Sequence, residues 1–389
     1  MSAVAYLDNQ ASTAVDATVA SLMAAYSQNC FGNPHSSGHS VGWTANSTVE
    51  VAKQRVAALI SADTEEIIFT SGATESNNLA ILGLRKGVHN CRRRVLRTPI
   101  EHKSVISACR YLVDDLEFDE AVIPVDSEGV IDLVALEITL RSGATLCSIG
   151  LVNSEIGSVQ DAAKIAELCR EYGVFLHIDA AQASTSVDME GLASHADLIS
   201  LSAHKMYGPM GIGALFVSRN VREYLTPLMY GGSQQDGLRP GTLPVPLCLG
   251  MGQAASICGG ESGELDRTHV RNLRDRFVNR LVGKDGSIIL NGPALDRRHP
   301  GNANLQFVGL DAQEILGALQ PHVAASSGSA CMSGIPEPSY VLRAIGLSAD
   351  QANSSLRFSF GKGNTVEEVD RSIELIMDAV GRVASHSVG

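Results

Sequence analysis

The sequence predicts an α/β protein with a mostly parallel sheet in a large domain, followed by a smaller α/β domain. Between residues 66 and 217, apolar β-rich runs alternate with helix-like segments, and repeated strand–helix–strand units form parallel sheets with right-handed connections. A chain of 389 residues is too long for one small core. The composition changes at residues 257–265, ICGGESGEL. We therefore expect an arm over residues 1–14 that packs on the small domain, a large domain over 15–258 and a small domain over 259–389.

Composition and charge narrow the classes of function. Apolar residues make up 44% of the chain and charged residues 19%, as in globular proteins. The formal net charge of −12 argues against nucleic-acid partners, which require a basic face. One basic cluster departs from this balance: Arg85, Lys86, Arg92, Arg93, Arg94 and Arg97. It is typical of a solvated helix end and strand entry, and a docking patch for an acidic partner is the alternative.

The cysteines, the first residues and the longest uncharged stretch bear on the cellular compartment of the protein. The eight cysteines, at positions 30, 91, 109, 147, 169, 248, 258 and 331, include no C-x-x-C pair, so no metal site and no disulfide framework is predicted. The opening MSAVAYLDNQ lacks a secretory pattern, and we expect a cytoplasmic protein. The longest uncharged stretch, 240–260, contains three prolines and five glycines. It predicts a loop and a packed helix, not a membrane span.

The first elements in chain order are an arm, a loop and a helix. The arm, AYLDNQASTAVD, has a short apolar start and then small and polar residues. Glycine, Asn-Pro and Ser-Ser-Gly in FGNPHSSGH, residues 31–39, predict a loop. The spacing of Val51, Val56 and Leu59 predicts an amphipathic helix over residues 50–60.

The next two units each consist of a strand, a turn and a helix. In EIIFTSGATESNNLAI the turn holds residues 71–74, where backbone N–H groups at a helix start could bind an anion. A plain capped helix is the alternative, because serine and threonine are favoured there. In RVLRTPIEHKSVISACRYL the strand exit carries Glu101, His102 and Lys103. A histidine at such a place is commonly a cap or a surface group. Asn153 follows the later strand LCSIGLV, within reach of the same edge.

Two further apolar runs, VFLHI and DLISLSA, end on polar residues. The first is followed by Asp179 and Gln182, and the second ends at Ser202, His204 and Lys205. In open α/β sheets ligands bind beyond the carboxyl ends of the strands. A lysine there, with a carboxylate from the neighbouring strand, suits a Schiff base to pyridoxal phosphate, whose ring nitrogen needs a fixed anion. An ordinary surface ion pair is the alternative.

The last part of the chain adds a loop, a helix-and-strand region and an unusual cysteine. Residues 229–246 are too rich in glycine and proline for a regular element, and helices are expected at 266–281 and 312–319 with strands at 287–290 and 303–308. Cys331 lies among small residues without an apolar period, so we expect a mobile, reachable loop, with a chance cysteine as the alternative. The other seven cysteines are interpreted as small core residues.

Arg357 lies inside a strand, where it needs a partner. A clamp on a substrate carboxylate accounts for it.

Several motifs, in order along nearly the full chain, resemble those of cysteine desulfurases. These enzymes are class V aminotransferase-like proteins within fold-type I of the pyridoxal phosphate enzymes, and the resemblance is to their longer-loop class. The motifs are LDNQAST, FGNPHSSGH, VNSEIG, SAHK followed by YGPMGIGAL, and SSGSAC followed by EPSYVLRAIG. Ser154, Asp236 and Met332 depart from the usual residues of the family.

The resemblance implies a role for each candidate residue. Lys205 would bind pyridoxal phosphate, Asp179 would keep the ring nitrogen protonated, Gln182 would bind the ring oxygen, and His102 would stack on the ring and move protons. The phosphate would be held by Ala73, Thr74, Ser202, His204 and, across the interface of a homodimer, Thr242. Asn153 would contact both cofactor and substrate, and Arg357 would bind the carboxylate of L-cysteine. Cys331 would take the sulfur as a persulfide, with His102 helping to deprotonate it, since a free thiol has a pKa of roughly 8.5.

Three functions remain open from the sequence. The first is a cysteine desulfurase that passes sulfur to an acceptor protein, for iron–sulfur cluster assembly or thio-modification. The second is a selenocysteine lyase or another β-eliminating lyase that releases its product without Cys331. The third is a non-catalytic scaffold that binds a sulfur acceptor, which would not need Lys205, Asp179, Gln182 and Arg357.

Overall fold

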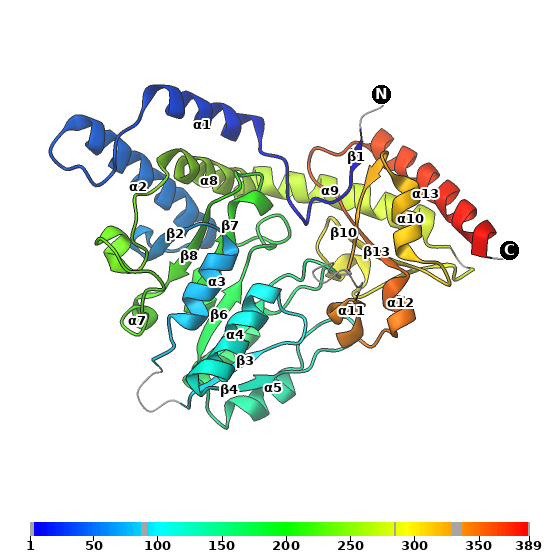
Figure 1. Cartoon of the computed structure of the whole chain (residues 1–389), viewed down its shortest axis with the longest axis horizontal. Coiled ribbons are helices and arrows are strands. Elements are labelled where there is room, and N and C mark those ends of the chain that lie inside the picture. Colours follow the sequence, from blue (N-terminus) through cyan, green and yellow to red (C-terminus); the bar gives the residue numbers. More distant parts are fainter. Residues whose placement is uncertain (1–3, 87–91, 284, 329–336, 388–389) are drawn as a thin grey trace.

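The larger part of the molecule is built on a mixed seven-stranded sheet (Figure 1). The structure, a computed structural model, describes residues 4–86, 92–283, 285–328 and 337–387. The strand order is β2 (Ile67–Thr70), β8 (Gly213–Val217), β7 (Leu198–Ser202), β6 (Phe175–Asp179), β5 (Leu146–Gly150), β3 (Arg94–Arg97) and β4 (Asp119–Val122). Strand β8 runs antiparallel to both of its neighbours, β2 and β7, and the other adjacent strands of this sheet are parallel to one another. The predicted α/β class with a mostly parallel sheet is confirmed.

Helices cover both faces of this sheet because the strands alternate apolar side chains between two cores. One face packs against α2 (Ser40–Ile60), α5 (Leu133–Leu140), α6 (Ala162–Glu171) and α8 (Val245–Cys258), and the other against α3 (Ala73–Leu82) and α4 (Lys103–Leu116). In β2, for example, Ile67 and Phe69 belong to the first core and Ile68 to the second, as the period of two along a strand requires. Helix α1 (Ala17–Asn29) packs on α8, and α7 (Arg219–Arg222) follows β8.

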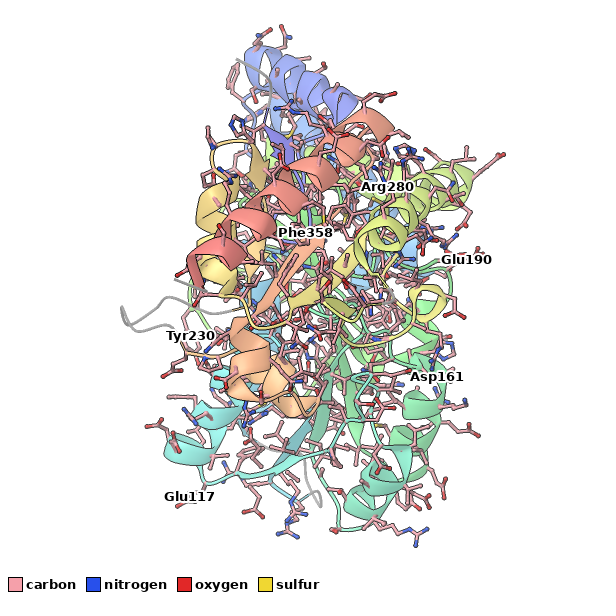
Figure 2. The ribbon with its side chains drawn as sticks, turned by 90° about the vertical axis from the view of Figure 1, so that its right-hand side faces the viewer. Glu117, Asp161, Glu190, Tyr230, Arg280 and Phe358 are labelled. Carbon is pink, nitrogen blue, oxygen red and sulfur yellow. The ribbon has the colours of Figure 1, made fainter. Side chains whose placement is uncertain are left out.

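The smaller part contains an antiparallel sheet with helices packed against it. Its strands are ordered β12 (Ser326–Ser327), β13 (Ser355–Ser359), β10 (Asn302–Phe307) and β9 (Ile288–Leu290). Helices α9 (Gly260–Leu281), α10 (Ala312–Leu319) and α13 (Val366–Ser387) contribute to its core. In Figure 2 the red helix α13 lies across β13, where Phe358 is fully buried. Helices α11 (Tyr340–Ala344) and α12 (Ala349–Asn353) precede β13.

The first residues of the chain join the smaller part. Strand β1 (Ala5–Tyr6) pairs in parallel with β11 (Val323–Ala324), and both Ala5 and Leu7 lie in the core of the smaller part. Short 3₁₀ helices complete the fold: η1 (Thr64–Glu66), η2 (Leu192–His195), η3 (Ala203–Lys205), η4 (Gln234–Gly237) and η5 (Leu295–Arg297). The arm therefore runs from the smaller part toward the strand ends of the larger sheet.

Some element boundaries differ from the expected ones. Helix α2 begins at Ser40 rather than near residue 50, with His39 as its N-cap. The segment 257–265, where we expect a boundary between domains, is mostly helical: α8 ends at Cys258, Gly259 has an extended conformation, and α9 begins at Gly260. One extended residue suffices to redirect the helix, so the composition change there marks a kink. Helix α8 belongs to the first core and α9 to the second, and the division into domains stays a prediction.

The cysteines and basic residues have the following surroundings. Cys109, Cys147, Cys169, Cys248 and Cys258 are buried, whereas Cys30 is only half-buried. The core interpretation is wrong for Cys30 because it lies at the C-cap of α1, where the chain leaves the helix. Cys91 and Cys331 lie outside the described residues.

Three members of the basic cluster have carboxylate neighbours, whereas Arg85 donates to backbone carbonyls and Arg93 lies over the ring of Phe118. Arg92 and Arg94 contact Asp119, and Arg97 forms a two-pronged pair with Glu120. These pairs indicate a solvated strand edge.

Over the described ranges, no helix combines the length and the apolar character needed to cross a membrane.

Candidate active site

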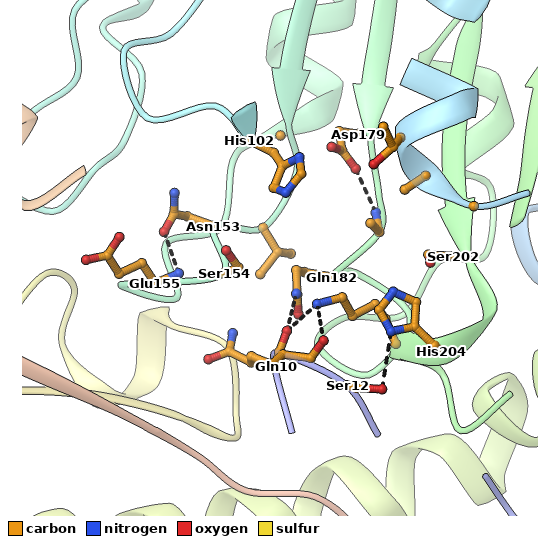
Figure 3. Close-up of a pocket in the computed structure, with 18 of the residues that line it drawn as sticks. Gln10, Ser12, His102, Asn153, Ser154, Glu155, Asp179, Gln182, Ser202 and His204 are labelled. Atoms are coloured by element: carbon orange, nitrogen blue, oxygen red, sulfur yellow. Dashed lines mark hydrogen bonds between the residues drawn. The ribbon is translucent and has the colours of Figure 1, made fainter. Parts of the chain in front are cut away.

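A cavity of roughly 640 Å³ opens at the carboxyl ends of the large sheet's strands (Figure 3). Most of the predicted site residues line it: Ala73, Thr74, His102, Asn153, Asp179, Gln182, Ser202, His204, Lys205 and Arg357. Thr242 is exposed and does not line this cavity. Cys331 lies outside the described residues. The fold therefore brings together side chains that the sequence pattern had singled out, although they come from both sheets and from segments far apart in the chain.

Lys205 lies in η3, directly after β7, and its amine points at the N-terminal arm. Nζ donates hydrogen bonds to the carbonyl oxygens of Gln10 and Ala11, the latter at 2.9 Å. Burial lowers the pKa of the Lys205 amine to about 8, and repulsion by Arg357 acts in the same direction. The amine is consequently a far better nucleophile near neutral pH than an ordinary lysine.

Asp179 ends β6 and is held by two donors. Its Oδ2 accepts a hydrogen bond from Asn77 Nδ2 at 2.7 Å, and its Oδ1 accepts one from the backbone N–H of Ala181 at 3.0 Å. Since Leu176 and Ile178 face the first core, Asp179 faces the other side of the sheet. Gln182 follows in the turn and donates from Nε2 to the carbonyl of Gln10 at 2.8 Å. A fixed carboxylate and an amide therefore lie on the same wall as the lysine.

The start of α3 forms an anion cradle beside them. Gly72 is the N-cap of α3, and in the described chain no side chain caps this helix start. Its first N–H groups are thus available to an anion. Gly213 is needed here because a Cβ at that position would lie 2.6 Å from the Cα of Gly72. His204 lies nearby, with its Nδ1 3.3 Å from Ser12 Oγ, and burial, followed by repulsion from Lys205, lowers the pKa of its ring.

Arg357 faces this wall from the smaller sheet. Leu356 and Phe358 pack in the smaller core, so the alternating pattern of β13 turns Arg357 toward the cavity. Its Nη2 donates to Asp8 Oδ1 at 2.7 Å and its Nη1 to the Ser154 carbonyl at 3.0 Å. Nε is buried and has no hydrogen-bond partner among the described residues. The guanidinium has five N–H groups and these two hydrogen bonds use two of them, so Nε–H is among the donors left for a ligand.

Asn153 holds its own turn as well as lining the cavity. Its Oδ1 accepts from the backbone N–H groups of Glu155 and Ile156, and its Nδ2 donates to the Ile100 carbonyl at 2.9 Å. The amide nitrogen has a second hydrogen, and this N–H is available to a ligand.

Sequence reasoning missed four groups that shape the cavity: Asp8 and Gln10 from the arm, Glu101 after β3, and Glu155 after β5. Burial raises the pKa of both glutamates to about 7. A Cβ on Gly328 would lie 2.0 Å from Glu155 Oε1, so Glu155 packs against the chain that leads to residue 331. The available signals were the position of Glu155 inside the motif VNSEIG and of Gln10 inside LDNQAST.

These residues fit pyridoxal phosphate. A reactive primary amine, a fixed carboxylate and an uncapped helix start lie in a single cavity, and they match the aldehyde, the ring nitrogen and the phosphate of that cofactor. In the part of the chain that the structure describes, no group of three or more histidine, cysteine, aspartate or glutamate side chains could hold a metal ion.

Comparisons with known proteins agree with this geometry. The family model described as aminotransferase class-V matches residues 5–371. A cysteine desulfurase IscS from Rickettsia rickettsii (strain Iowa) is 44% identical over 382 residues, which cover 98% of this chain and 92% of the relative. A solved structure of a NifS-like protein has a TM-score of 0.88 and 31% identity, covering 97% of this chain and 99% of that one. A structure of SspA in complex with cysteine has a TM-score of 0.79 and 33% identity, covering 92% and 99%.

Proposed function

The chain belongs to the class-V aminotransferase family, and from this membership we propose that it is a pyridoxal phosphate-dependent cysteine desulfurase. It converts L-cysteine into L-alanine and receives the sulfur as a persulfide on Cys331. The observation that carries the proposal is the single cavity in which Lys205, with its lowered pKa, meets Asp179 on one wall and Arg357 on the other. The cysteine desulfurase relatives and the relative solved with cysteine support it.

We assign the cofactor contacts as follows. Bound through Lys205, pyridoxal phosphate supplies an electron sink for a carbanion at the substrate α-carbon. Asp179 would hold the proton on the ring nitrogen, Gln182 would bind the ring oxygen, and His102 would stack on the ring. The phosphate contacts come from Ala73, Thr74, Ser202 and His204, with Thr242 from a second copy of the chain.

The protein's own groups bind the substrate and move its protons. Arg357 binds the substrate carboxylate, using its buried Nε, while Asp8 and Ser154 keep the guanidinium in place. The substrate amine displaces the Lys205 amine. Because burial keeps a large fraction of this amine neutral near pH 8, the released amine can accept the α-proton of the substrate. Asn153 contributes its remaining amide hydrogen.

The sulfur transfer balances without an oxidant. The Cys331 thiolate attacks the substrate sulfur, the carbon–sulfur bond breaks, and its electron pair stays with the carbon. That carbon takes up protons, so L-cysteine and one thiol give L-alanine and one persulfide. The role of Cys331 rests on the family resemblance of its SSGSAC segment.

We propose a homodimer and an acceptor protein as partners. Support for the dimer comes from exposed large apolar side chains, since Phe31 is 90% exposed, Trp43 59% and Tyr230 81%. Such groups gather at interfaces. Thr242 lies outside the cavity of its own chain, as a residue that completes a neighbour's site would. We also propose a cytoplasmic location, where Cys331 stays a free thiol.

The experiment that tests this function follows sulfur and alanine together. The holoenzyme is incubated with L-cysteine without reductant, alanine is quantified, and the peptide that contains residue 331 is weighed by mass spectrometry. We expect alanine and one added sulfur on that peptide. Cys331→Ser should abolish both, whereas Cys30→Ser, which alters the half-buried cysteine at the end of α1, should change neither.

Each other outcome points to one of the remaining functions. Alanine formed while residue 331 stays unmodified indicates a lyase that releases its product freely, with selenocysteine as the next substrate to assay. Absence of both alanine and a bound cofactor indicates a non-catalytic scaffold.

A further inference from the structure

A buried chain of hydrogen bonds connects Asp179 with His102. Asn77 Nδ2, from α3, donates to Asp179 Oδ2 at 2.7 Å and to Ser104 Oγ at 2.9 Å. Ser104, in the first turn of α4, places its Oγ 2.7 Å from His102 Nδ1. Asn77 is fully buried, and Ser104 and Asp179 are 9% and 8% exposed. The two ends, Asp179 and His102, both line the cavity (Figure 3).

The chemistry of the four groups fixes the direction of this chain. An ionised carboxylate only accepts hydrogen bonds, so Asn77 must turn its nitrogen toward Asp179. A flipped amide would bring its oxygen against the carboxylate oxygen. In the required orientation the amide nitrogen uses both of its hydrogens, one on Asp179 and one on Ser104. Ser104 Oγ is therefore an acceptor from Asn77, and its own hydrogen is free to point at His102.

The backbone N–H of Ser104 decides the remaining direction: a hydroxyl oxygen could accept from both Asn77 and His102, but a ring nitrogen that accepts from this N–H has no hydrogen to donate. His102 Nδ1 therefore has two donors. One is the hydroxyl of Ser104, and the other is the backbone N–H of Ser104 at 3.2 Å, because His102 is also the N-cap of α4. A nitrogen that accepts from both carries no hydrogen of its own. A neutral imidazole carries its one hydrogen on the opposite nitrogen, Nε2. His102 is exposed and lines the cavity, and Nε2 is the ring nitrogen that the chain from Asp179 leaves to the cavity.

We propose that Ser104 and Asn77 are positioning residues that hold His102 in the tautomer with its hydrogen on Nε2. His102 then presents a hydrogen-bond donor to the cofactor and substrate, and it does not serve through Nε2 as the base that deprotonates Cys331. Asp179 sets the tautomer because it orients Asn77. The role toward the reaction rests on the proposed function, whereas the tautomer itself is a property of this chain alone.

The tautomer is measured directly by nuclear magnetic resonance on the full-length holoenzyme with ¹⁵N-labelled histidine. The side-chain correlation pattern distinguishes a hydrogen on Nε2 from one on Nδ1 and from the doubly protonated ring. The His102 signals are assigned as those lost in His102→Gln. Between about pH 7 and 8 we expect the Nε2–H pattern for His102. A dominant Nδ1–H or doubly protonated pattern would overturn the proposal.

Ser104→Ala tests the cause. It removes the hydroxyl and retains the backbone donor, so the ratio of the Nε2–H to the Nδ1–H form should fall roughly five- to tenfold, the value of one lost hydrogen bond. The signals of His177, whose ring nitrogens contact Ser148 and Ser200, should stay unchanged. Turnover should fall by a similar factor with little change in KM. The matched control is Ser372→Ala, another buried helical serine, whose hydroxyl donates to the Glu368 carbonyl.

The outcomes separate this inference from the proposed function. An unchanged tautomer ratio in Ser104→Ala refutes the inference even if the enzyme makes alanine. A protein that shows the expected tautomers but makes no alanine refutes the function and leaves the inference standing. A change of the ratio in Ser372→Ala as well would show a general response to helix substitution, which also refutes the assignment to Ser104.

Discussion

Each of the two walls of the cavity carries a buried cation, and the surroundings of the two cations differ. On the large-sheet wall, Lys205 hydrogen-bonds to two backbone carbonyls of the arm and, among the described residues, to no carboxylate. On the small-sheet wall, Arg357 forms an ion pair with Asp8 at 2.7 Å. Burial without a counter-ion lowers the pKa of the lysine to about 8 and produces a nucleophile. Burial with a counter-ion produces a permanent cation, which the proposed binding of the substrate carboxylate requires.

The strongest test of this contrast is the loss of the nucleophile. Lys205→Ala should lower turnover by roughly a thousandfold or more, because the variant loses both the covalent attachment of the cofactor and the proton acceptor. The measurement is the rate of alanine release from L-cysteine with excess cofactor. Lys164→Ala removes an exposed lysine on α6 and should match the unaltered enzyme. A Lys205→Ala variant with more than about a tenth of the original rate would show that the large-sheet wall does not act as proposed.

On the other wall, a conservative exchange should affect binding. Arg357→Lys keeps the charge and loses the fork of donors that holds Asp8, the Ser154 carbonyl and the substrate carboxylate together. We expect KM for L-cysteine to rise about 30-fold, the value of a lost charged hydrogen bond, with a smaller change in kcat. Arg92→Lys, in the exposed pair with Asp119, serves as the control. An unchanged KM accompanied by a reduced kcat would contradict the anchoring role.

The contrast between the walls also separates what the sequence predicts from what it does not. Strand ends such as those at Asp179 and Lys205 follow from local apolar runs, and the parallel order brings them to one edge. The ion pair between Asp8 and Arg357 joins residues separated by 349 positions. This pairing depends on how the arm after β1 lies beside β13, where Asp8 bridges to Ser359, and no local pattern encodes that contact. Likewise, the orientation of the Asn77 side chain cannot be predicted from the local sequence, because its partner Ser104 comes into reach only when α3 packs beside α4.

The walls should influence one another through charge. In the cofactor-free protein, covalent capture of pyridoxal phosphate requires the neutral amine of Lys205, so its rate should rise with pH around a midpoint near 8 and not near the ordinary 10.5. Arg357 is the largest contributor to that low pKa after burial. Arg357→Met should therefore move the midpoint upward. Capture is followed by absorbance over a pH series, and a midpoint that stays in place would show that the two walls are electrostatically independent.

The smallest expected effect concerns stability, and it comes from two buried glutamates that shape the cavity, Glu101 after β3 and Glu155 after β5. Burial raises the pKa of Glu101 and of Glu155 from 4.5 to about 7, with repulsion from Asp179 adding to the shift of Glu101. Between those two values the folded state holds more protons than the unfolded state, so the free energy of unfolding falls as pH rises from about 4.5 to 7 and then levels. At pH 8, Glu155→Gln and Glu101→Gln should each raise it by roughly 2 kcal/mol, since glutamine needs no proton to be neutral.

Chemical denaturation at about pH 5 and pH 8 measures these differences. Each variant should reduce the loss of stability between the two conditions. Glu65→Gln alters a glutamate whose side chain is 88% exposed and should leave the loss unchanged. If only Glu101→Gln reduces it, water reaches Glu155 beside Gly328. If neither variant reduces the loss of stability, both glutamates are ionised at both pH values. The exclusion of water that lowers the pKa of Lys205 then does not extend to these two glutamates.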